Sequence, residues 1–412
     1  MTTPCVMLVA AEPSGDSLGA GLAAALKVRL GGAVRLVGVG GPLMSAEGVQ
    51  SPFEISGLSV MGVFEALKAY PLVLRRAREA ARIAGRERPD VSVLIDSWGF
   101  NLRVARQLRR VRPGLFIFKY VGPQVWATRP GRARTLARAV DHLLTIHTFD
   151  APFFEREGLG VTFVGNPALA KNIAHADPAR LRAAIGAAPD DPILLVAPGS
   201  RRGEIDRMLP PFEAAVALLK SRRPGLRVVV IAADQVAPIV AAQVAAWPHE
   251  AHVVTGEAAR LDAMRAATVA LACSGTVTTE LAQCGAPMVV AYRLGVLTYA
   301  IVQRLLRTRY ITLLNVAAQR FVAPEMLQGN CNAEALAREI GLRLDDPGLR
   351  ARQARDQTAA LEIMRGGVED PFAAAAEAVA RRLPPSDGIA PAGQMASLAP
   401  HRPVGRRQER RE

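Results

Sequence analysis

The chain has 412 residues, 50% of them hydrophobic, which is more than one ordinary core holds, so we expect two domains. Charged residues make up 21%, a globular proportion that excludes a mostly disordered chain. The formal net charge of +14 favours polyanionic partners such as nucleotide phosphates, anionic lipid or nucleic acid. Aromatic residues are only 5% and form no ladder with basic residues, so nucleic acid is the least favoured of these partners.

The cysteines and the apolar runs limit the choice of compartment. Cys5, Cys273, Cys284 and Cys331 show neither CxxC spacing nor a nearby histidine cluster, which argues against a zinc site or a disulfide framework. A reducing cytoplasm fits this pattern. The apolar run at 6–11 is too short for a signal peptide, and no stretch approaches the ~18–20 apolar residues of a spanning helix. We expect a protein that does not cross a membrane.

Short apolar runs alternate with amphipathic segments in two series. In the first series we expect a helix over roughly 17–30 and buried strands at 6–9, 36–39, 91–95 and 115–121. In the second series we expect buried strands at 193–196, 228–232, 253–254, 269–272 and 288–291. Strands that alternate with helices of this length indicate parallel sheets. We therefore predict an α/β chain with two Rossmann-like, doubly wound domains and a break in the polar stretch 166–188.

Doubly wound sheets bind ligands at the carboxyl ends of their strands. The loop after 6–9 contains Glu12, Ser14, Gly15 and Asp16. Its glycine allows close approach of the backbone, and the N-terminus of the next helix favours anions. Helix capping by Ser14 or Asp16 is an alternative that leaves Glu12 unexplained.

Two further loops of the first series carry polar residues after strands. Asp96 directly follows the run 91–95, where a carboxylate is well placed as a general base, although capping of the next helix is equally compatible. In the loop after 115–121, Trp126 is readily explained as a core residue, whereas Gln124 and Arg129 are not. These loops make the first domain a candidate for the acid–base chemistry.

Two turns of the second series suit phosphate groups. The first contains Gly199, Ser200 and Arg201, which offer backbone amides and a guanidinium. The second opens a helix with Ser274, Gly275 and Thr276, and Glu280 follows it, placed either to reach a ribose or to complete a capping pair. Two such turns in one domain indicate a nucleoside diphosphate. Neither has a DxD-type acidic pair beside it, so we expect no metal and no other cofactor, with helix dipoles and arginine stabilising the leaving group.

Taken in order, these loops resemble those of lipid-A-disaccharide synthases over about residues 6–383. The family's AGExSGD, GVGGPxM and LxVMGxxE elements are matched at 10–16, 38–44 and 58–65. Its IDxxxFN, PxVWA, PGSRxxEI and SGTxTxE elements follow at similar spacing, and YITLxN and PExLQ are matched at 310–315 and 324–328. Several of these elements are common individually, but the ordered set is specific.

The resemblance implies a GT-B arrangement, in which two Rossmann-like domains face each other across a cleft. Residues 1–170 are then the N-terminal acceptor and membrane-facing domain, and residues 171–365 are the C-terminal UDP-sugar-binding domain. Residues 366–383 are expected to form a helix that returns to the N-terminal domain. Residues 384–412, rich in Pro, Arg, Gly and Ala without periodicity, are expected to be a disordered tail.

The resemblance also implies a reaction: UDP-2,3-diacylglucosamine and 2,3-diacylglucosamine 1-phosphate give the β-1,6-linked lipid A disaccharide 1-phosphate and UDP. An α-linked donor that yields a β product implies inversion, for which one displacement and one base suffice. Glu12 and Asp96 match the family's candidate acidic residues, and we rank Asp96 first as the base, with Glu12 as orienter or substitute. Arg201, Glu280 and Asn315 match the family's nucleotide side. The other expected substrate or UDP contacts are Ser14, Gly15, Asp16, Gln124, Gly199, Ser200, Ser274, Gly275, Thr276, Glu325 and Gln328.

This chain departs from the family pattern at a few positions, none of which removes a candidate acid or phosphate ligand. Ala11 replaces a glycine, Trp98-Gly99 stands where Pro-Asp is frequent, Asn166 replaces a histidine, and Leu314 replaces a proline. The preferred acyl chain therefore stays open, as does the oligomeric state, with a homodimer among the alternatives. A rival enzyme of the same fold, a UDP-N-acetylglucosamine 2-epimerase, would turn over a UDP-sugar with no lipid present.

The segment 58–78 joins an apolar stretch to an arginine cluster. The residues alone favour a buried core helix. The resemblance favours an interfacial segment, because acylated substrates reside in a bilayer. We therefore predict a cytoplasmic protein bound peripherally to anionic lipid of the inner membrane. The residues expected to contact this membrane are Val60, Met61, Val63, Phe64, Leu67 and Leu72.

Overall fold

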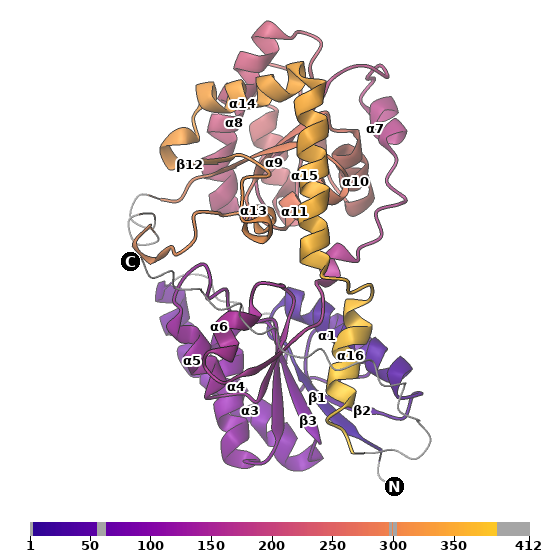
Figure 1. Cartoon of the computed structure of the whole chain (residues 1–412), viewed down its shortest axis with the longest axis vertical. Helices are drawn as coiled ribbons and strands as arrows, with labels where there is room; N and C mark the ends of the chain where they lie inside the picture. The colour runs from indigo at the N-terminus through magenta and orange to yellow at the C-terminus, as the bar shows by residue number, and fades with distance from the viewer. Residues whose placement is uncertain (1–2, 56–62, 296–298, 300–302, 385–412) are drawn as a thin grey trace, which may run out of the picture.

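The computed structural model describes residues 3–55, 63–295, 299 and 303–384 (Figure 1). The N-terminal half forms a parallel sheet of six strands in the order β2-β1-β3-β4-β5-β6. Its strands are β1 (Cys5–Val9), β2 (Arg35–Val39), β3 (Val91–Ile95), β4 (Phe116–Tyr120), β5 (His142–Thr145) and β6 (Gly160–Phe163). Its helices are α1 (Pro13–Arg29), α2 (Pro42–Ala46), α3 (Val63–Glu87), α4 (Trp98–Val111), α5 (Gly131–Ala137) and α6 (Ala151–Glu155).

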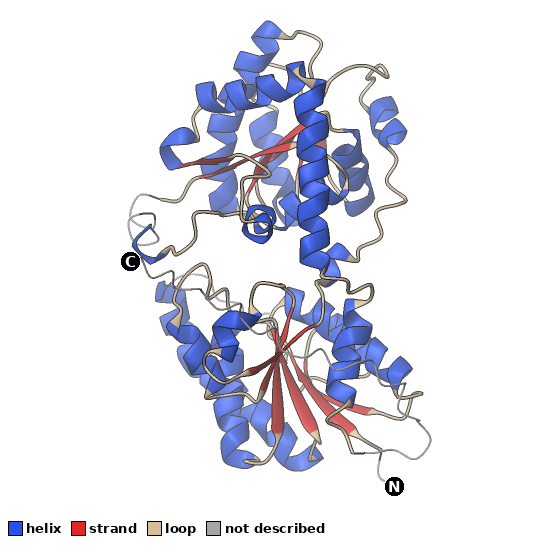
Figure 2. Ribbon diagram, viewed as in Figure 1, coloured by secondary structure: helices blue, strands red, loops and turns tan. Residues whose placement is uncertain are grey.

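The C-terminal half forms a second parallel sheet of six strands, in the order β12-β11-β10-β7-β8-β9. Its strands are β7 (Ile193–Ala197), β8 (Arg227–Ile231), β9 (His252–Val254), β10 (Val269–Cys273), β11 (Met288–Tyr292) and β12 (Glu325–Leu327). Its helices are α7 (Pro178–Ala184), α8 (Arg202–Arg222), α9 (Ala237–Val244), α10 (Glu257–Ala266), α11 (Thr276–Gln283), α13 (Leu313–Ala318), α14 (Ala333–Asp345) and α15 (Pro347–Arg365). Figure 2 shows helices on both faces of each sheet.

These sheets confirm the prediction of two doubly wound domains. The central strands β1, β3, β7 and β10 are buried along their whole length, because helices cover both faces. In each sheet the strand order reverses at one place, between β1 and β3 in the first sheet and between β7 and β10 in the second. Doubly wound sheets form their ligand crevice at this switch point. The candidate loops after these four strands therefore lie at the two crevices.

The last helix of the described residues, α16 (Pro371–Ala380), belongs spatially to the N-terminal domain and lies beside α1 (Figure 1). Its buried face, Ala375, Ala376 and Val379, joins the core that contains β1. An ion pair between Arg29 Nε and Glu377 Oε2 at 2.6 Å adds a polar contact. The chain thus crosses between the domains twice, before α7 and after α15.

The two domains also touch through an apolar cluster. Trp126, from the loop after β4, packs with Phe149 and Phe153 against Tyr310, Leu313 and Val316 of the C-terminal domain. The backbone N–H of Arg307 donates to the carbonyl of Ala127 at 3.1 Å across the same seam. These contacts bring the loops at the ends of the two sheets to face each other.

Candidate active site

A cavity of about 1180 Å³ lies between the domains and is lined by both. Ser14, Asp96 and Gln124 line it from the N-terminal domain, and Ser274–Thr276 line it from the C-terminal domain. Ser274, Gly275 and Thr276 also border a smaller cavity of about 300 Å³ inside the C-terminal domain. The two cavities therefore adjoin at these residues, and we refer to them together as the cleft, which extends from Asp96 to the turn after β7.

Asp96 stands at the wall of this cleft in a left-handed backbone conformation, with φ +50°. The hydroxyl of Ser14 donates a hydrogen bond to Asp96 Oδ2 at 2.8 Å. Helix α4 begins after Ser97 without a side-chain capping bond, so the capping alternative for Asp96 is wrong. A non-glycine residue in this region costs about 1–3 kcal/mol, a strain that clusters at functional sites. The backbone thus orients the carboxylate toward the cleft.

Gly15 explains how Ser14 comes within reach of Asp96. A Cβ at this position would lie 3.2 Å from the Cβ of Ala10 and 3.4 Å from the carbonyl oxygen of Ile95. A side chain here would have to displace Ala10 by a few tenths of an ångström, so glycine favours the close approach of the first turn of α1 to the end of β3. Gly15 therefore acts through packing, and α1 begins with no side-chain cap at Glu12.

Asp16 has a structural role in place of the substrate contact that we expected. Its carboxylate accepts hydrogen bonds from the backbone N–H groups of Gly41, Leu43 and Met44 at 2.8–3.0 Å. It is buried and satisfies the free amides at the start of α2. Capping of its own helix is therefore wrong as well. Asp16 joins the loop after β1 to the loop after β2.

Beneath Asp96 lies Lys119, a residue that the sequence interpretation missed. Its ammonium group is fully buried and donates to the carbonyls of Leu94 at 3.3 Å, of Tyr120 at 3.2 Å, and of Asp96. Burial lowers the pKa of Lys119 to about 7, although the Asp96 and Glu12 carboxylates act to raise it. The signal was a lysine inside the otherwise apolar run of β4. Lys119 ties together the ends of β3 and β4.

The turn after β7 is shaped by Gly199 and Glu204. Gly199 has φ +117°, and a Cβ there would lie 2.7 Å from Glu204 Oε2. That oxygen accepts a hydrogen bond from the Ser200 N–H at 3.1 Å. Arg201 has 61% of its side chain exposed and lies 3.5 Å from Glu204 Oε1. The turn is therefore preorganised, and the Arg201 guanidinium is exposed at the cavity.

Glu280 is held by two cations at the opposite side of the smaller cavity. Its carboxylate is 3.3 Å from Lys171 Nζ and 3.5 Å from an Arg260 nitrogen. Lys171 comes from the connection between the domains and also contacts Glu257 at 2.8 Å. Helix α11 has no side-chain cap, so the capping pair is wrong for Glu280. Lys171 and Arg260 were not recognised from the sequence, because their partners lie far along the chain.

Asn315, Glu325 and Gln328 take part in internal hydrogen bonds, and among the described residues none of the three lines the cleft. Asn315 is fully buried and donates to Glu325 Oε1 at 2.7 Å. Glu325 also accepts from the N–H groups of Ile311 and Thr312, which do line the cleft. Gln328 Oε1 accepts from the Leu294 N–H at 2.6 Å. These three residues therefore position loops and do not contact the cleft directly.

A buried polar group lies behind the cleft wall near His147. The hydroxyl of Thr145 donates to Asp150 Oδ2 at 2.5 Å, and burial raises the pKa of Asp150 to about 7. Burial lowers the pKa of His147 to about 4, and its ring stacks on Phe149 with centroids 5.2 Å apart. His147 therefore presents a neutral ring to the cleft at neutral pH.

Comparison with known proteins decides between enzymes of this fold. A family model described as lipid-A-disaccharide synthetase matches residues 6–374. The lipid-A-disaccharide synthase of Rhodospirillum centenum is 41% identical over 374 residues, covering 91% of this chain and 93% of the relative. That of Ruegeria pomeroyi is 42% identical over 388 residues, covering 92% and 95%. This chain belongs to the lipid-A-disaccharide synthase family.

Solved structures show the fold alone. A UDP-GlcNAc 2-epimerase from Neisseria meningitidis, bound to UDP-GlcNAc, is similar with a TM-score of 0.60 at 9% identity, covering 92% of this chain and 99% of that one. Acinetobacter baumannii MurG is similar with a TM-score of 0.53 at 15% identity, with the same coverage. The synthase family and its glycosyltransferase class confirm the resemblance read from the ordered motifs, and the GT-B fold is confirmed. The likeness to the epimerase extends to the fold and no further.

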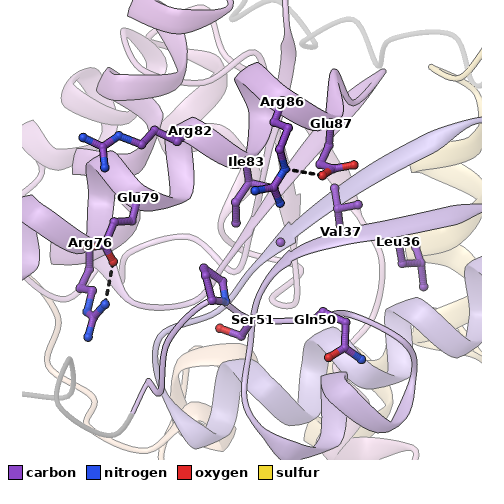
Figure 3. A pocket seen from close by; sticks show the side chains of 12 residues that line it. Leu36, Val37, Gln50, Ser51, Arg76, Glu79, Arg82, Ile83, Arg86 and Glu87 are labelled. Atoms are coloured by element: carbon purple, nitrogen blue, oxygen red, sulfur yellow. Dashed lines mark hydrogen bonds and ion pairs between the residues drawn. The ribbon is translucent and has the colours of Figure 1, made fainter.

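Another cavity, of about 630 Å³, lies on the synthase's N-terminal domain beside the edge strand β2 (Figure 3). Its arginines are largely paired, Arg76 with Glu79 at 2.6 Å and Arg86 with Glu87 at 2.7 Å. It is lined by the middle of β2 and by α3, and it shares no lining residue with the cleft. We assign it no part in the reaction.

Two structural features of the synthase concern metals and membranes. Within the described ranges, no group of three His, Cys, Asp or Glu side chains gathers in a way that would hold a metal ion. Among the helices described, none has the length and apolar character needed to span a bilayer. Val60 and Met61 lie outside the described residues, whereas Val63, Phe64 and Leu67 fall in the first turns of α3 and Leu72 is half-buried there.

Proposed function

We propose that this enzyme transfers the 2,3-diacylglucosaminyl group of UDP-2,3-diacylglucosamine to the 6-hydroxyl of 2,3-diacylglucosamine 1-phosphate. The acceptor oxygen forms a bond to the anomeric carbon as the bond to the UDP oxygen breaks. The acceptor proton passes to a protein base, and UDP leaves with the bonding electrons. Because one displacement inverts the anomeric centre, the α-linked donor gives the β-1,6-linked disaccharide 1-phosphate.

Asp96 is the proposed base. Its carboxylate borders the cleft, and the Ser14 hydroxyl occupies only Oδ2, which leaves Oδ1 available to an acceptor hydroxyl. A general base must come within hydrogen-bond reach of the proton it takes. Glu12 directly precedes α1 and is not among the residues that line the cleft, and it stays the alternative base or orienting residue. Gln124, which is exposed on the cleft wall, is a further substrate contact.

The smaller cavity is the proposed site for the UDP group. Its two turns, at Gly199–Arg201 and Ser274–Thr276, lie at the switch point between β7 and β10. Backbone amides at the start of α11 and the Arg201 guanidinium stabilise the charge that develops on the leaving diphosphate. Glu280, on the same cavity, is the candidate acceptor for the ribose hydroxyls. The leaving group is thereby stabilised by groups that the chain itself supplies.

One observation carries the proposal: two adjoining cavities connect Asp96, which has a left-handed backbone in one domain, to a phosphate-suited switch point in the other. The test is a thin-layer assay of the purified protein with both acylated sugars. We expect a disaccharide and UDP in equal amounts, and no reaction when the acceptor is left out. Turnover of the UDP-sugar without acceptor would contradict the proposal and favour an epimerase.

We further propose peripheral binding to anionic lipid of the inner membrane through the start of α3. Beyond that start, Tyr70 and the arginines Arg75 and Arg78 are exposed. Exposed arginines next to apolar side chains suit a lipid interface. Replacing Val63, Phe64, Leu67 and Leu72 with serine should release the protein from anionic vesicles while UDP affinity persists.

The matched control is the charge-neutral variant Val28→Ser, which changes an exposed apolar residue of α1. It should bind vesicles as the wild type does. Unfolding of the serine variant, seen as a lost cooperative melting transition, would place the segment in the core and contradict membrane contact. A homodimer stays a prediction, which sedimentation equilibrium decides.

A further inference from the structure

Arg129 and Arg132 lie one turn apart in the segment that follows β4, whose earlier residues Gln124 and Trp126 line the cleft. The Arg132 N–H donates to the Arg129 carbonyl at 3.0 Å, which closes one turn at the start of α5. Trp126, from the same loop, lines the cleft. Within the described parts of the chain, neither guanidinium has a carboxylate within ion-pair distance. The next arginine of α5, Arg134, is paired with Glu157 at 2.9 Å.

Arg132 packs directly against the loop that carries Asp96. Its guanidinium carbon lies 5.2 Å from the ring centroid of Trp98, two residues after Asp96. Burial, and then the positive charge of Arg129, lower the pKa of Arg132. Two neighbouring guanidinium groups that have no paired carboxylate are stabilised by a bound anion. Trp98 is one of the positions at which this chain departs from its family, and its ring fixes the Arg132 side chain.

The larger cavity, between the domains, offers a phosphate no comparable partner in its lining. Its charged lining includes the carboxylates of Asp96, Glu257, Glu369 and Asp370. Its lysine, Lys171, is already paired with Glu257 at 2.8 Å. A phosphate dianion placed among these carboxylates would be repelled, which favours a position beside arginines outside this lining.

We propose that Arg129 and Arg132 bind the 1-phosphate group of the acceptor sugar and so direct its reacting hydroxyl toward Asp96. This inference rests on the proposed function, since only that acceptor brings a sugar phosphate to this side of the cleft. Guanidinium groups match the oxygens of a phosphate monoester in pairs, which fixes orientation as well as position. The donor, whose diphosphate binds in the other domain, makes no use of the pair.

The test compares the acceptor 1-phosphate with the same acylated sugar lacking the phosphate, both in neutral detergent. With the phosphorylated acceptor, Arg132→Met should raise the acceptor KM by about tenfold or more, because a charge-assisted contact is lost. The donor KM and UDP affinity should stay within about twofold. With the dephosphorylated acceptor, the variant and the wild type should have equal kcat/KM. Arg129→Met should show the same changes in acceptor KM. Because Arg129 is exposed, this variant should fold even where Arg132→Met does not.

Arg138→Met is the matched control, because it removes an exposed arginine from the far end of the same helix. It should change neither KM. Equal losses of Arg132→Met and Arg129→Met on both acceptors would overturn the inference. So would lost binding to anionic vesicles with an unchanged acceptor KM, which would assign the pair to lipid headgroups. Failure of the proposed function is distinguishable, since the wild type would then make no disaccharide from either acceptor.

Discussion

The buried Lys119 makes a quantitative prediction about stability. In the folded protein its pKa is about 7, against an ordinary value of 10.5, because burial disfavours the ammonium form. Between these two values the unfolded chain binds a proton that the folded chain does not. The free energy of unfolding therefore rises with pH across this window, with a slope approaching about 1.4 kcal/mol per pH unit. Lys119→Met keeps the length of the side chain and removes this dependence.

The magnitude follows from the two pKa values. Between pH 7 and pH 8.5, the stability of the wild type should rise by about 1.6 kcal/mol relative to Lys119→Met. The thiols of the unfolded chain begin to ionise near the top of this range, because burial raises the pKa of thiols such as Cys284 to about 11 only in the folded protein. The difference between the two proteins also removes the contribution of every group that they share.

The assay is urea unfolding followed by tryptophan fluorescence at several pH values. The chain has three tryptophans, and the replacement Trp247→Phe leaves Trp98 and Trp126, both in the N-terminal domain with Lys119. Lys27→Met is the matched control, because it removes the same chemical group from a half-exposed site that pairs with Glu47. Parallel pH profiles for the wild type and Lys119→Met would refute the reasoning and indicate a lysine charged in both states.

Four further predictions concern the site and its surroundings. Asp96→Asn should lower kcat by about 100-fold or more with UDP affinity unchanged, as removal of a general base does, and a loss below about tenfold would transfer the role to Glu12. Arg201→Ala should weaken UDP binding by about tenfold in a calorimetric titration, because it removes a charge-assisted phosphate contact; unchanged affinity would place the diphosphate elsewhere. EDTA should leave turnover unchanged, and activity that disappeared and returned with magnesium would contradict stabilisation by the protein alone. Asp150→Asn should become more stable relative to the wild type as pH rises from about 4 to 7, because the folded carboxyl, with its pKa raised to about 7, keeps a proton that the unfolded chain releases. A relative stability that did not change over this range would show that Asp150 is ionised in the fold.

Local sequence was sufficient for the central strands and for the loops of the two crevices. The runs at 6–9, 91–95 and 269–272 are buried on both faces, so they appear as continuous apolar stretches, and the structure has strands there. The strands β5, β6 and β12 were missed. They lie toward the edges of the sheets, span only three or four residues, and in β6 and β12 are only partly buried, which leaves a weak apolar signal.

Only the tertiary structure decided what each polar residue of the motifs does. Asp16 and Asn315 belong to specific motifs, yet the side chains of both are occupied by buried hydrogen bonds to other segments. No local sequence pattern predicted these partners. Ser14 meets Asp96, 82 residues away in the chain, because the strand order places β1 beside β3. Lys119 became part of the site for the same reason, since β4 adjoins β3. The motifs indicated which residues are typical of this family. The order of the strands determined which of these residues face the cleft, because that order depends on contacts between residues distant in sequence.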